Sequence, residues 1–192
     1  MQVKEDLRVI KTKKALAEAF VRLLNSRKLD DITINELCEE AGVRRATFYK
    51  HYDDKYSFIT AYTTSLRDVF ERDIWKSDTP GATKDYYVEY AKRLVMFISE
   101  HSAEIDNIYK SSLFPSVLSI IVDQNYQDTC ERLRYSQEHG MQLSASVEVT
   151  ASMCTGGVAQ TVHNWLRSDR ELSADELANQ IGDVVAAAIE KK

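Results

Sequence analysis

Apolar residues recur at helical spacing along most of the chain, and the alternation typical of strands is rare. The first apolar stripe consists of Leu16, Phe20, Leu23 and Leu24, and it predicts a helix that ends near Arg27. Six glycines and two prolines in 192 residues leave few positions where a helix must stop. The pattern therefore predicts an all-α protein of about nine helices.

Residues 32–55 predict two short helices joined by a glycine turn. Thr33 followed by Glu36 is the sequence pattern of a capping box, so the first short helix should begin directly after Thr33. Gly42 can then adopt the left-handed conformation that ends a helix. The second helix should run over about residues 44–51. This arrangement predicts a helix-turn-helix.

The second short helix should turn its cations and hydroxyls away from the core. Phe48 is its one bulky apolar residue and is expected to point inward. Asp53 is placed to cap the next helix, whose first turn then contains Lys55. A lysine there gains nothing from the helix dipole, whereas a nearby DNA phosphate would account for it. A small helical subdomain with a solvated charged face is the alternative, but the combination of cap, turn, cations and tyrosine favours DNA binding.

The segment GVRRATFYKHYDDKYSF resembles the signature of TetR/AcrR-family transcriptional regulators, Gly-Val-x-x-x-Thr-(Phe/Leu)-Tyr-x-His-(Phe/Tyr)-x-x-Lys. The resemblance extends over residues 8–60 and implies that Arg45 and Lys50 hold base-reading positions. It implies phosphate contacts for Thr33, Thr47, Tyr49, His51 and Lys55. Arg44, a further DNA-binding candidate, stands where a serine cap is frequent in the family. The end of the chain also resembles the branch that includes regulators of dihydroxyacetone kinase.

Two domains are predicted. Residues 1–54 should form a three-helix DNA-binding domain, and residues 55–192 a helical bundle for regulation and dimerisation. A long helix over residues 54–75 should link them, followed by the proline- and glycine-containing linker at residues 77–83. The remaining apolar stripes predict further helices, the last of them opened by a second capping box from Ser173 to Glu176.

Charge is divided unevenly between these parts. Residues 1–55 carry 12 Lys and Arg against 10 Asp and Glu, a net charge of +2, whereas residues 56–192 carry 13 against 20, a net charge of −7. The DNA-binding face is therefore expected in the N-terminal part, and the acidic remainder should repel DNA. Residues 1–14 contain five cations and predict a mobile basic lead-in, either an arm that contacts DNA or a solvated terminus.

The last two predicted helices are candidates for a homodimer interface. Gly156 and Gly157 fall in the middle of a helix, where each costs about 0.5–1 kcal/mol relative to alanine. Close approach of a partner helix would offset that cost, and the family resemblance implies a four-helix interface here. The alternative is that these helices complete the core of the monomer. The interface candidates are Gly157, Val158, Thr161, Trp165, Ile181 and Val185.

Double-stranded DNA and a second copy of the chain are two expected partners, and a small-molecule effector of unknown identity is the third. Helical bundles bind small molecules between their helices. Residues that combine aromatic surface with polar groups are the pocket candidates: Tyr86, Tyr90, Phe97, Tyr109, Phe114, Asn125, Tyr126 and Met153. The expected function is a repressor that an effector releases from DNA. The alternative is a regulator, such as an activator, that a partner protein controls.

Enzyme and metal sites are not expected. The sequence contains no Gly-x-Ser-x-Gly elbow, no phosphate-binding glycine loop and no His-Glu-x-x-His motif. Its four histidines and three cysteines lack the spacing of metal ligands, so we expect no cofactor and interpret the cysteines as buried thiols. A signal peptide and a membrane-length apolar run are both missing from the sequence, which favours the cytoplasm. An unrecognised helical enzyme is the remote alternative.

Overall fold

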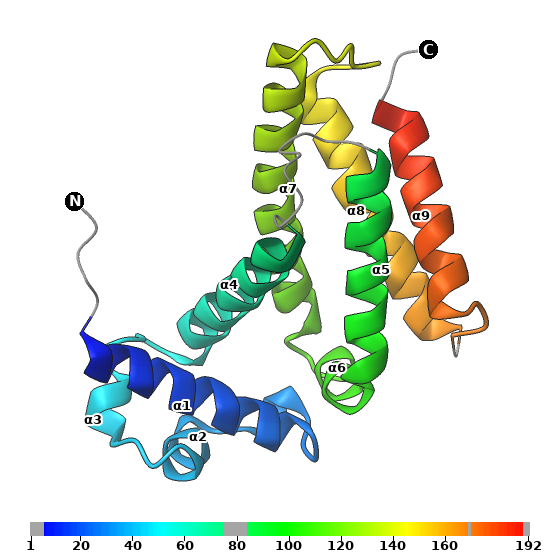
Figure 1. The fold of residues 1–192 in the computed structure, drawn as a ribbon. Helices are drawn as coiled ribbons and strands as arrows, with labels where there is room; N and C mark the ends of the chain where they lie inside the picture. The colour runs from blue at the N-terminus through cyan, green and yellow to red at the C-terminus, as the bar shows by residue number, and fades with distance from the viewer. Residues whose placement is uncertain (1–5, 75–83, 169, 190–192) are drawn as a thin grey trace. The chain divides into compact units, whose positions relative to one another are not determined.

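The computed structural model describes residues 6–74, 84–168 and 170–189, and within them it contains nine α-helices, one 3₁₀ helix and no β-strand. The elements are α1 (Leu7–Leu24), η1 (Leu29–Asp31), α2 (Ile34–Glu40), α3 (Arg45–Phe48), α4 (Lys55–Ile74), α5 (Lys84–Glu100), α6 (Ser102–Tyr109), α7 (Phe114–Glu138), α8 (Val147–Arg167) and α9 (Ala174–Ile189) (Figure 1). The predicted all-α fold is confirmed. The predicted linker at residues 77–83 lies outside the described residues.

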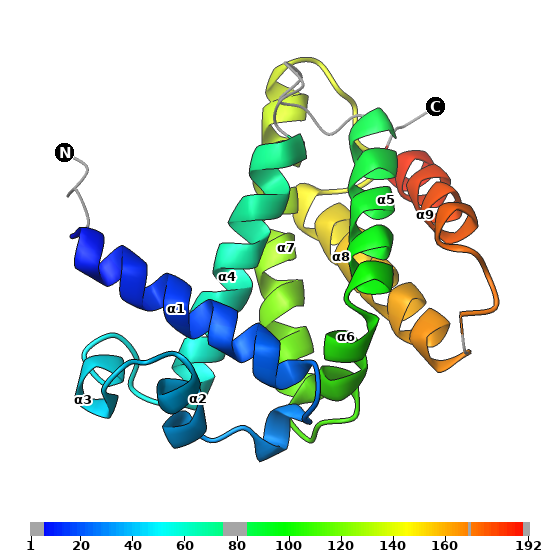
Figure 2. The ribbon, with the colours of Figure 1, turned by 60° about the horizontal axis from the view of Figure 1, so that its bottom comes forward.

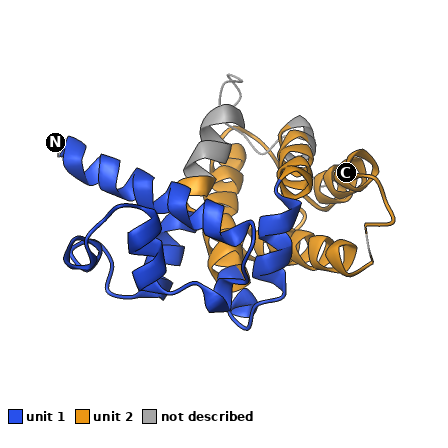
Figure 3. Cartoon of the chain, turned by 90° about the horizontal axis from the view of Figure 1, so that it is seen from below, with its two compact units in different colours: residues 1–63, 101–117 blue, residues 64–100, 118–192 orange. Residues whose placement is uncertain are grey.

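Two compact units make up the chain, and their limits differ from the predicted boundary at residue 54. Unit 1 comprises Met1–Thr63 and His101–Val117, and unit 2 comprises Thr64–Glu100 and Leu118–Lys192 (Figure 3). The difference arises because α6 and the start of α7 contribute apolar side chains to the core of unit 1. Val117 belongs to that core, and Ile108 and Leu113 pack against it.

Aromatic rings fill the centre of unit 1. Phe20 from α1 makes edge-to-face contacts with Phe58 and Tyr62 from α4, at centroid distances of 5.2 Å and 5.1 Å. Phe48 from α3 lies 5.3 Å from the Tyr52 ring and is fully buried, as its apolar character predicted. Burial raises the pKa of Tyr62 to about 12. The short α3 is therefore anchored to the longer helices through a single phenylalanine.

Helix α1 begins earlier than the sequence predicted. The segment predicted as a mobile lead-in is helical from Leu7, because the Asp6 carboxylate accepts a hydrogen bond of 2.9 Å from the backbone N–H of Arg8 and caps the helix. Lys11, Lys13 and Lys14 accordingly lie on an exposed helical surface. Helix α1 packs against α2, and Figure 2 shows the two side by side within unit 1.

Helices α5, α7, α8 and α9 supply the core of unit 2, in which α9 packs against both α5 and α8 (Figure 2). Helix α7 ends near Gly140, whose φ of +97° lets the N–H of Met141 reach the carbonyl of Ser136 at 2.9 Å. The second predicted capping box is confirmed. The backbone N–H of Ser173 donates to Glu176 at 3.0 Å, and the N–H of Glu176 donates to the Ser173 hydroxyl at 3.3 Å.

Candidate nucleic-acid interface

The turn between α2 and α3 has the geometry that the sequence predicted. Thr33 and Glu36 form a complete capping box, so α2 begins at Ile34. Gly42 adopts a φ of +65°, a conformation that side chains with a Cβ rarely take. The N–H of Val43 then returns to the carbonyl of Cys38 at 2.9 Å and closes the end of α2. The glycine therefore sets the direction in which the chain enters α3.

Helix α3 is shorter than predicted. Its α-helical part covers Arg45–Phe48, and residues 49–51 continue as a turn in which the N–H of His51 donates to the carbonyl of Phe48 at 2.9 Å. Arg44 is the N-cap residue, and its side chain makes no capping hydrogen bond. An arginine side chain cannot accept the hydrogen bonds that a serine cap would accept, so α3 begins without a side-chain cap.

The surface of this segment is polar and cationic, with Phe48 as its buried anchor. The side chains of Arg44, Arg45, Tyr49 and Lys50 are exposed, and those of Thr47 and His51 are half-buried. The Tyr49 ring lies under the Arg45 guanidinium, whose carbon is 5.7 Å from the ring centroid. Exposed cations and hydroxyls on a helix whose opposite face is anchored by the buried Phe48 can contact phosphates and base edges.

Helix α4 is capped by Asp54 and not, as predicted, by Asp53. The Asp54 carboxylate accepts a hydrogen bond of 2.7 Å from the N–H of Ser57, and the Ser57 hydroxyl accepts one of 3.1 Å from the N–H of Asp54. Two adjacent aspartates made the sequence ambiguous. Only Asp54 is followed three positions later by a residue, Ser57, whose side chain can accept a hydrogen bond from the N–H of the capping residue.

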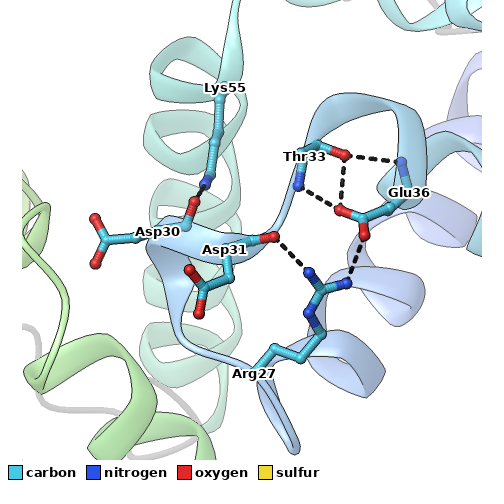
Figure 4. A network of polar contacts seen from close by, with 6 residues as sticks. All are labelled: Arg27, Asp30, Asp31, Thr33, Glu36 and Lys55. Carbon is cyan, nitrogen blue, oxygen red and sulfur yellow. Dashed lines mark hydrogen bonds and ion pairs between the residues drawn. The ribbon is translucent and has the colours of Figure 1, made fainter.

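Lys55 is a DNA-binding candidate whose charged group is engaged by backbone carbonyls of unit 1. Its Nζ donates to the carbonyl oxygen of Leu29 and, at 3.4 Å, to that of Asp30 (Figure 4). Burial lowers the pKa of the Lys55 ammonium, an effect that the nearby carboxylates of Asp30 and Asp31 oppose. These carbonyls give a structural reason for a lysine at the start of α4. The predicted phosphate contact must therefore compete with them.

Arg27 is a functional candidate that sequence reasoning missed. Its guanidinium donates to the Glu36 carboxylate at 2.7 Å and to the carbonyl of Asp31 at 2.7 Å (Figure 4). Glu36 in turn accepts from the Thr33 hydroxyl at 2.7 Å. The hydrogen bonds from Arg27 and Thr33 lower the pKa of Glu36 to about 2. The side chain of Thr33 is thus held in place by an ionised carboxylate, itself bound by an arginine nine residues earlier.

The structure separates the dimer candidates into two groups. Trp165, Ile181 and Val185 are buried in the core of unit 2, with exposed fractions of 5–7%. An amphipathic stripe can be covered by its own chain as well as by a partner, and the core of unit 2 already covers these three side chains. Gly157 and Thr161 are exposed and Val158 is half-buried. Only this second group remains available to a partner.

The pocket candidates belong to different units. Tyr109 and Phe114 are in unit 1, where their rings pack edge to face at 4.9 Å. In unit 2, the Tyr90 hydroxyl donates to the Asn125 side chain. Met153 is 70% exposed on α8 and therefore does not line an interior site of this chain. Half-buried side chains in unit 2 complete the predicted set: Tyr86, Tyr90, Phe97, Asn125 and Tyr126.

A buried arginine near these unit 2 candidates was not predicted. Arg132 on α7 is 7% exposed, and its guanidinium carbon lies 4.4 Å from the centroid of the Tyr86 ring. The signal in the sequence was a cation next to the inward-facing Cys130 and Leu133 of the same helix. Burying a charged side chain is costly, and the contact with the Tyr86 ring offsets part of that cost.

The cysteines are free and buried, as predicted, and burial raises the pKa of the Cys38 and Cys154 thiols. Among the residues that the structure describes, no three His, Cys, Asp or Glu side chains gather in a way that could hold a metal ion. Over the same residues, every helix is too short or too polar to cross a membrane.

A helix-turn-helix whose second helix exposes cations is the arrangement found in DNA-binding regulators. Comparison with known families agrees, since residues 14–62 match the model of the bacterial regulatory proteins of the tetR family. The HTH-type transcriptional regulator YxbF of Bacillus subtilis is 41% identical over 55 residues, which are 28% of this chain and 14% of that protein. Residues 14–62 therefore resemble the helix-turn-helix region of tetR-family regulators, and the chain spans about a seventh of the length of the curated relative that it matches.

Solved structures of transcriptional regulators share the fold. A TetR-family regulator from Syntrophomonas wolfei superposes with a TM-score of 0.70 at 11% identity, covering 92% of this chain and 93% of that one. The transcriptional regulator FadR from Bacillus subtilis, solved in complex with stearoyl-CoA, gives a TM-score of 0.64 at 15% identity, with 92% and 99% of the two chains covered. At such identities the likeness concerns the fold alone.

Proposed function

We propose that this regulator binds a palindromic DNA operator as a homodimer and that a small-molecule effector releases it. The observation that carries the DNA-binding part is the surface of α3. Phe48 is completely buried while Tyr49, the next residue, is 45% exposed between the exposed Arg45 and Lys50. A rigidly anchored helix with an exposed cationic face has the form that enters the major groove in helix-turn-helix proteins.

Each side chain of this interface has a proposed role. Arg45 and Lys50 read base edges, because arginine and lysine donate to the acceptors of guanine in the major groove. The remaining candidates bind phosphates through hydroxyl, imidazole and ammonium groups. They are Thr33, Arg44, Thr47, Tyr49, His51 and Lys55.

Dimerisation is proposed through the exposed face of α8 together with α9. Val149 and Met153 are 53% and 70% exposed, and Val184 on α9 is 70% exposed. A side chain at Gly156 or Gly157 would have open space, because no neighbouring atom lies within 4 Å of the position that its Cβ would occupy. Packing within the chain therefore gives no reason for glycine there. A helix of the partner that approaches closely would supply that reason. A dimer also fits palindromic operators, whose two half-sites are related by twofold symmetry.

The effector is proposed to bind among the aromatic and polar side chains of unit 2. FadR of Bacillus subtilis, which shares this fold, was solved in complex with stearoyl-CoA, and this supports a ligand-binding role for the present chain. Helix α4 contributes residues to both units, so a ligand that shifts α4 would change the spacing of the two α3 helices. DNA requires that spacing to be about 34–36 Å. To change the operator from mostly bound to mostly free, the effector must bind the released state of the regulator about 5.5 kcal/mol more tightly than the DNA-bound state.

Selection of bound duplexes from a random DNA pool, followed by sequencing, tests this function. The proposal expects an enriched palindrome that binds one dimer, with an affinity that falls steeply as salt rises. Candidate small molecules are then titrated into the complex. Enrichment of a non-palindromic site bound by a monomer would refute the dimer. A complex that responds only to a protein fraction would favour the alternative, a regulator controlled by a partner protein.

A further inference from the structure

The 3₁₀ helix η1 is held by side chains from three other parts of unit 1. The Lys55 ammonium of α4 binds the carbonyls of Leu29 and Asp30, and the Arg27 guanidinium binds the carbonyl of Asp31 (Figure 4). These three residues are the whole of η1. Because carbonyls in so short a helix have few partners within it, the donors that reach them determine how the segment is placed.

The third tether comes from a segment 82 residues later in the chain. The backbone N–H of Ser112 donates to one carboxylate oxygen of Asp30 at 2.9 Å, and the Ser112 hydroxyl donates to the other at 2.5 Å. These two hydrogen bonds are the main cause of a lowered pKa at Asp30. An ionised carboxylate bound at both oxygens fixes the position and the rotation of its residue.

The segment that carries Ser112 is firmly packed in unit 1. Val117 is 6% exposed in the core, and the Asn107 side chain donates to the carbonyl of Leu24 at 2.7 Å. Along the chain, the same segment continues into the remainder of α7, which belongs to unit 2. The Ser112–Asp30 contact therefore joins η1 to a segment that is covalently continuous with the regulatory part of the chain.

On its other side, η1 leads directly into the proposed phosphate-binding end of α2. Thr33 follows Asp31 by two residues, and the residue between them, Ile32, is 2% exposed. Arg27 spans this junction, since it binds both the Asp31 carbonyl and the Glu36 carboxylate that holds Thr33. A displacement of η1 would therefore reach Thr33 along the backbone through the buried Ile32, and through the hydrogen bonds of Arg27 and Glu36.

We propose that Asp30 and Ser112 are positioning residues for DNA binding, which hold η1 so that the α2 capping box presents Thr33 to a phosphate. The proposal rests on the proposed function of the α2–α3 surface. Asp30 and Ser112 do not themselves touch DNA in this account. Because the Asp30 carboxylate is exposed, its loss should affect the placement of η1 far more than the stability of the fold. Any change that withdraws Ser112 would lower DNA affinity without altering a DNA-contacting residue.

Four full-length variants test the proposal: Asp30→Ala, Asp30→Asn, Ser112→Ala and Ser112→Thr. Asp30→Ala removes both Ser112–Asp30 hydrogen bonds. Asp30→Asn weakens one of them and Ser112→Ala removes one, whereas Ser112→Thr keeps the hydroxyl. Arg134→Ala is the matched control, because it removes an exposed contact of 3.1 Å with Glu148 in unit 2. Amide hydrogen exchange at residues 29–37 and the dissociation constant for a selected duplex are measured for each.

Asp30→Ala is expected to speed exchange at residues 29–37 and to raise the dissociation constant about three- to tenfold, the worth of one or two hydrogen bonds. Asp30→Asn and Ser112→Ala should have smaller effects of the same sign. Ser112→Thr and the Arg134 control should match the wild type. Unchanged exchange in Asp30→Ala would overturn the proposal whether or not the wild type binds DNA. Faster exchange with unchanged DNA affinity would overturn it as well. A wild type that binds no duplex would instead refute the proposed function.

Discussion

The guanidinium of Arg45 donates through Nη2 to the Tyr49 hydroxyl at 3.4 Å and lies 5.7 Å from the centre of its ring. The two residues are one turn apart on α3 and its C-cap, so the contact restricts the rotamers of both. Pre-arranged side chains lose less conformational entropy when they bind, which lowers the cost of recognition. In the account proposed here, Arg45 reads a base while Tyr49 holds a neighbouring phosphate.

Arg45→Ala should weaken binding to the selected duplex by about 1–3 kcal/mol and relax specificity at one base pair. The reason is that an arginine can donate two parallel hydrogen bonds to guanine, which no other base pair accepts equally. Dissociation constants are measured for the selected duplex and for its single-base variants. A uniform loss over all duplexes would show that Arg45 binds only the backbone.

Tyr49→Phe should weaken all duplexes alike. This substitution removes the hydroxyl that is proposed to donate to a phosphate and keeps the ring that lies under Arg45. The expected loss is about 0.5–1.5 kcal/mol, the net contribution of a hydrogen bond. The same panel of duplexes provides the measurement, and Tyr56→Phe, another exposed tyrosine in unit 1, is the control. Loss confined to one base pair would contradict the phosphate role.

Much of the fold could be predicted because its signals are local. Both capping boxes involve residues three positions apart, and Gly42 ends α2 through its own backbone conformation. Phe48 was recognisable as the anchor of α3 because it is the one bulky apolar residue of that helix. Local signals also failed where two residues competed, as Asp53 and Asp54 did for the start of α4.

The contacts between distant residues could not be predicted. Nothing in one sequence pairs Asp30 with Ser112 or directs Lys55 to the carbonyl of Leu29. The dimer candidates show a related difficulty. The stripe containing Trp165 is equally compatible with burial in the chain's own core and with burial against a partner, and the structure assigns it to the core. Periodicity identifies the apolar face of a helix without identifying what covers it.

The Glu36 network should stabilise the protein above about pH 4.5 and lose that effect in acid. The pKa of Glu36 falls from 4.5 to about 2 on folding, so the folded state favours the ionised carboxylate. Its contribution is complete above the unfolded pKa and is lost as the pH falls through about 2. Urea unfolding of the wild type and of Glu36→Gln is compared between about pH 6 and pH 3. The difference between them should shrink towards the acid end, and a constant difference would argue against an ionised Glu36.

Gly157→Leu should convert the dimer to a monomer. The space around Gly157 is open within the chain, so the monomer can accept a larger side chain, whereas a closely packed partner helix cannot. Sedimentation velocity measures the oligomeric state, and operator affinity should fall at least about tenfold because the two half-sites are no longer bound together. Gln127→Leu, at an exposed position of α7, is the control. A dimer that persists in Gly157→Leu would place the interface elsewhere.

The helix that follows Gly42 is proposed to enter a groove of duplex DNA. Duplex selection at low ionic strength with the wild type, repeated with the double variant Arg45→Ala, Lys50→Ala, tests it most directly. The wild type is expected to enrich one palindromic sequence, and the folded double variant is expected to enrich none. A double variant that selects the same sequence as the wild type, or a wild type that retains no duplex, would contradict it.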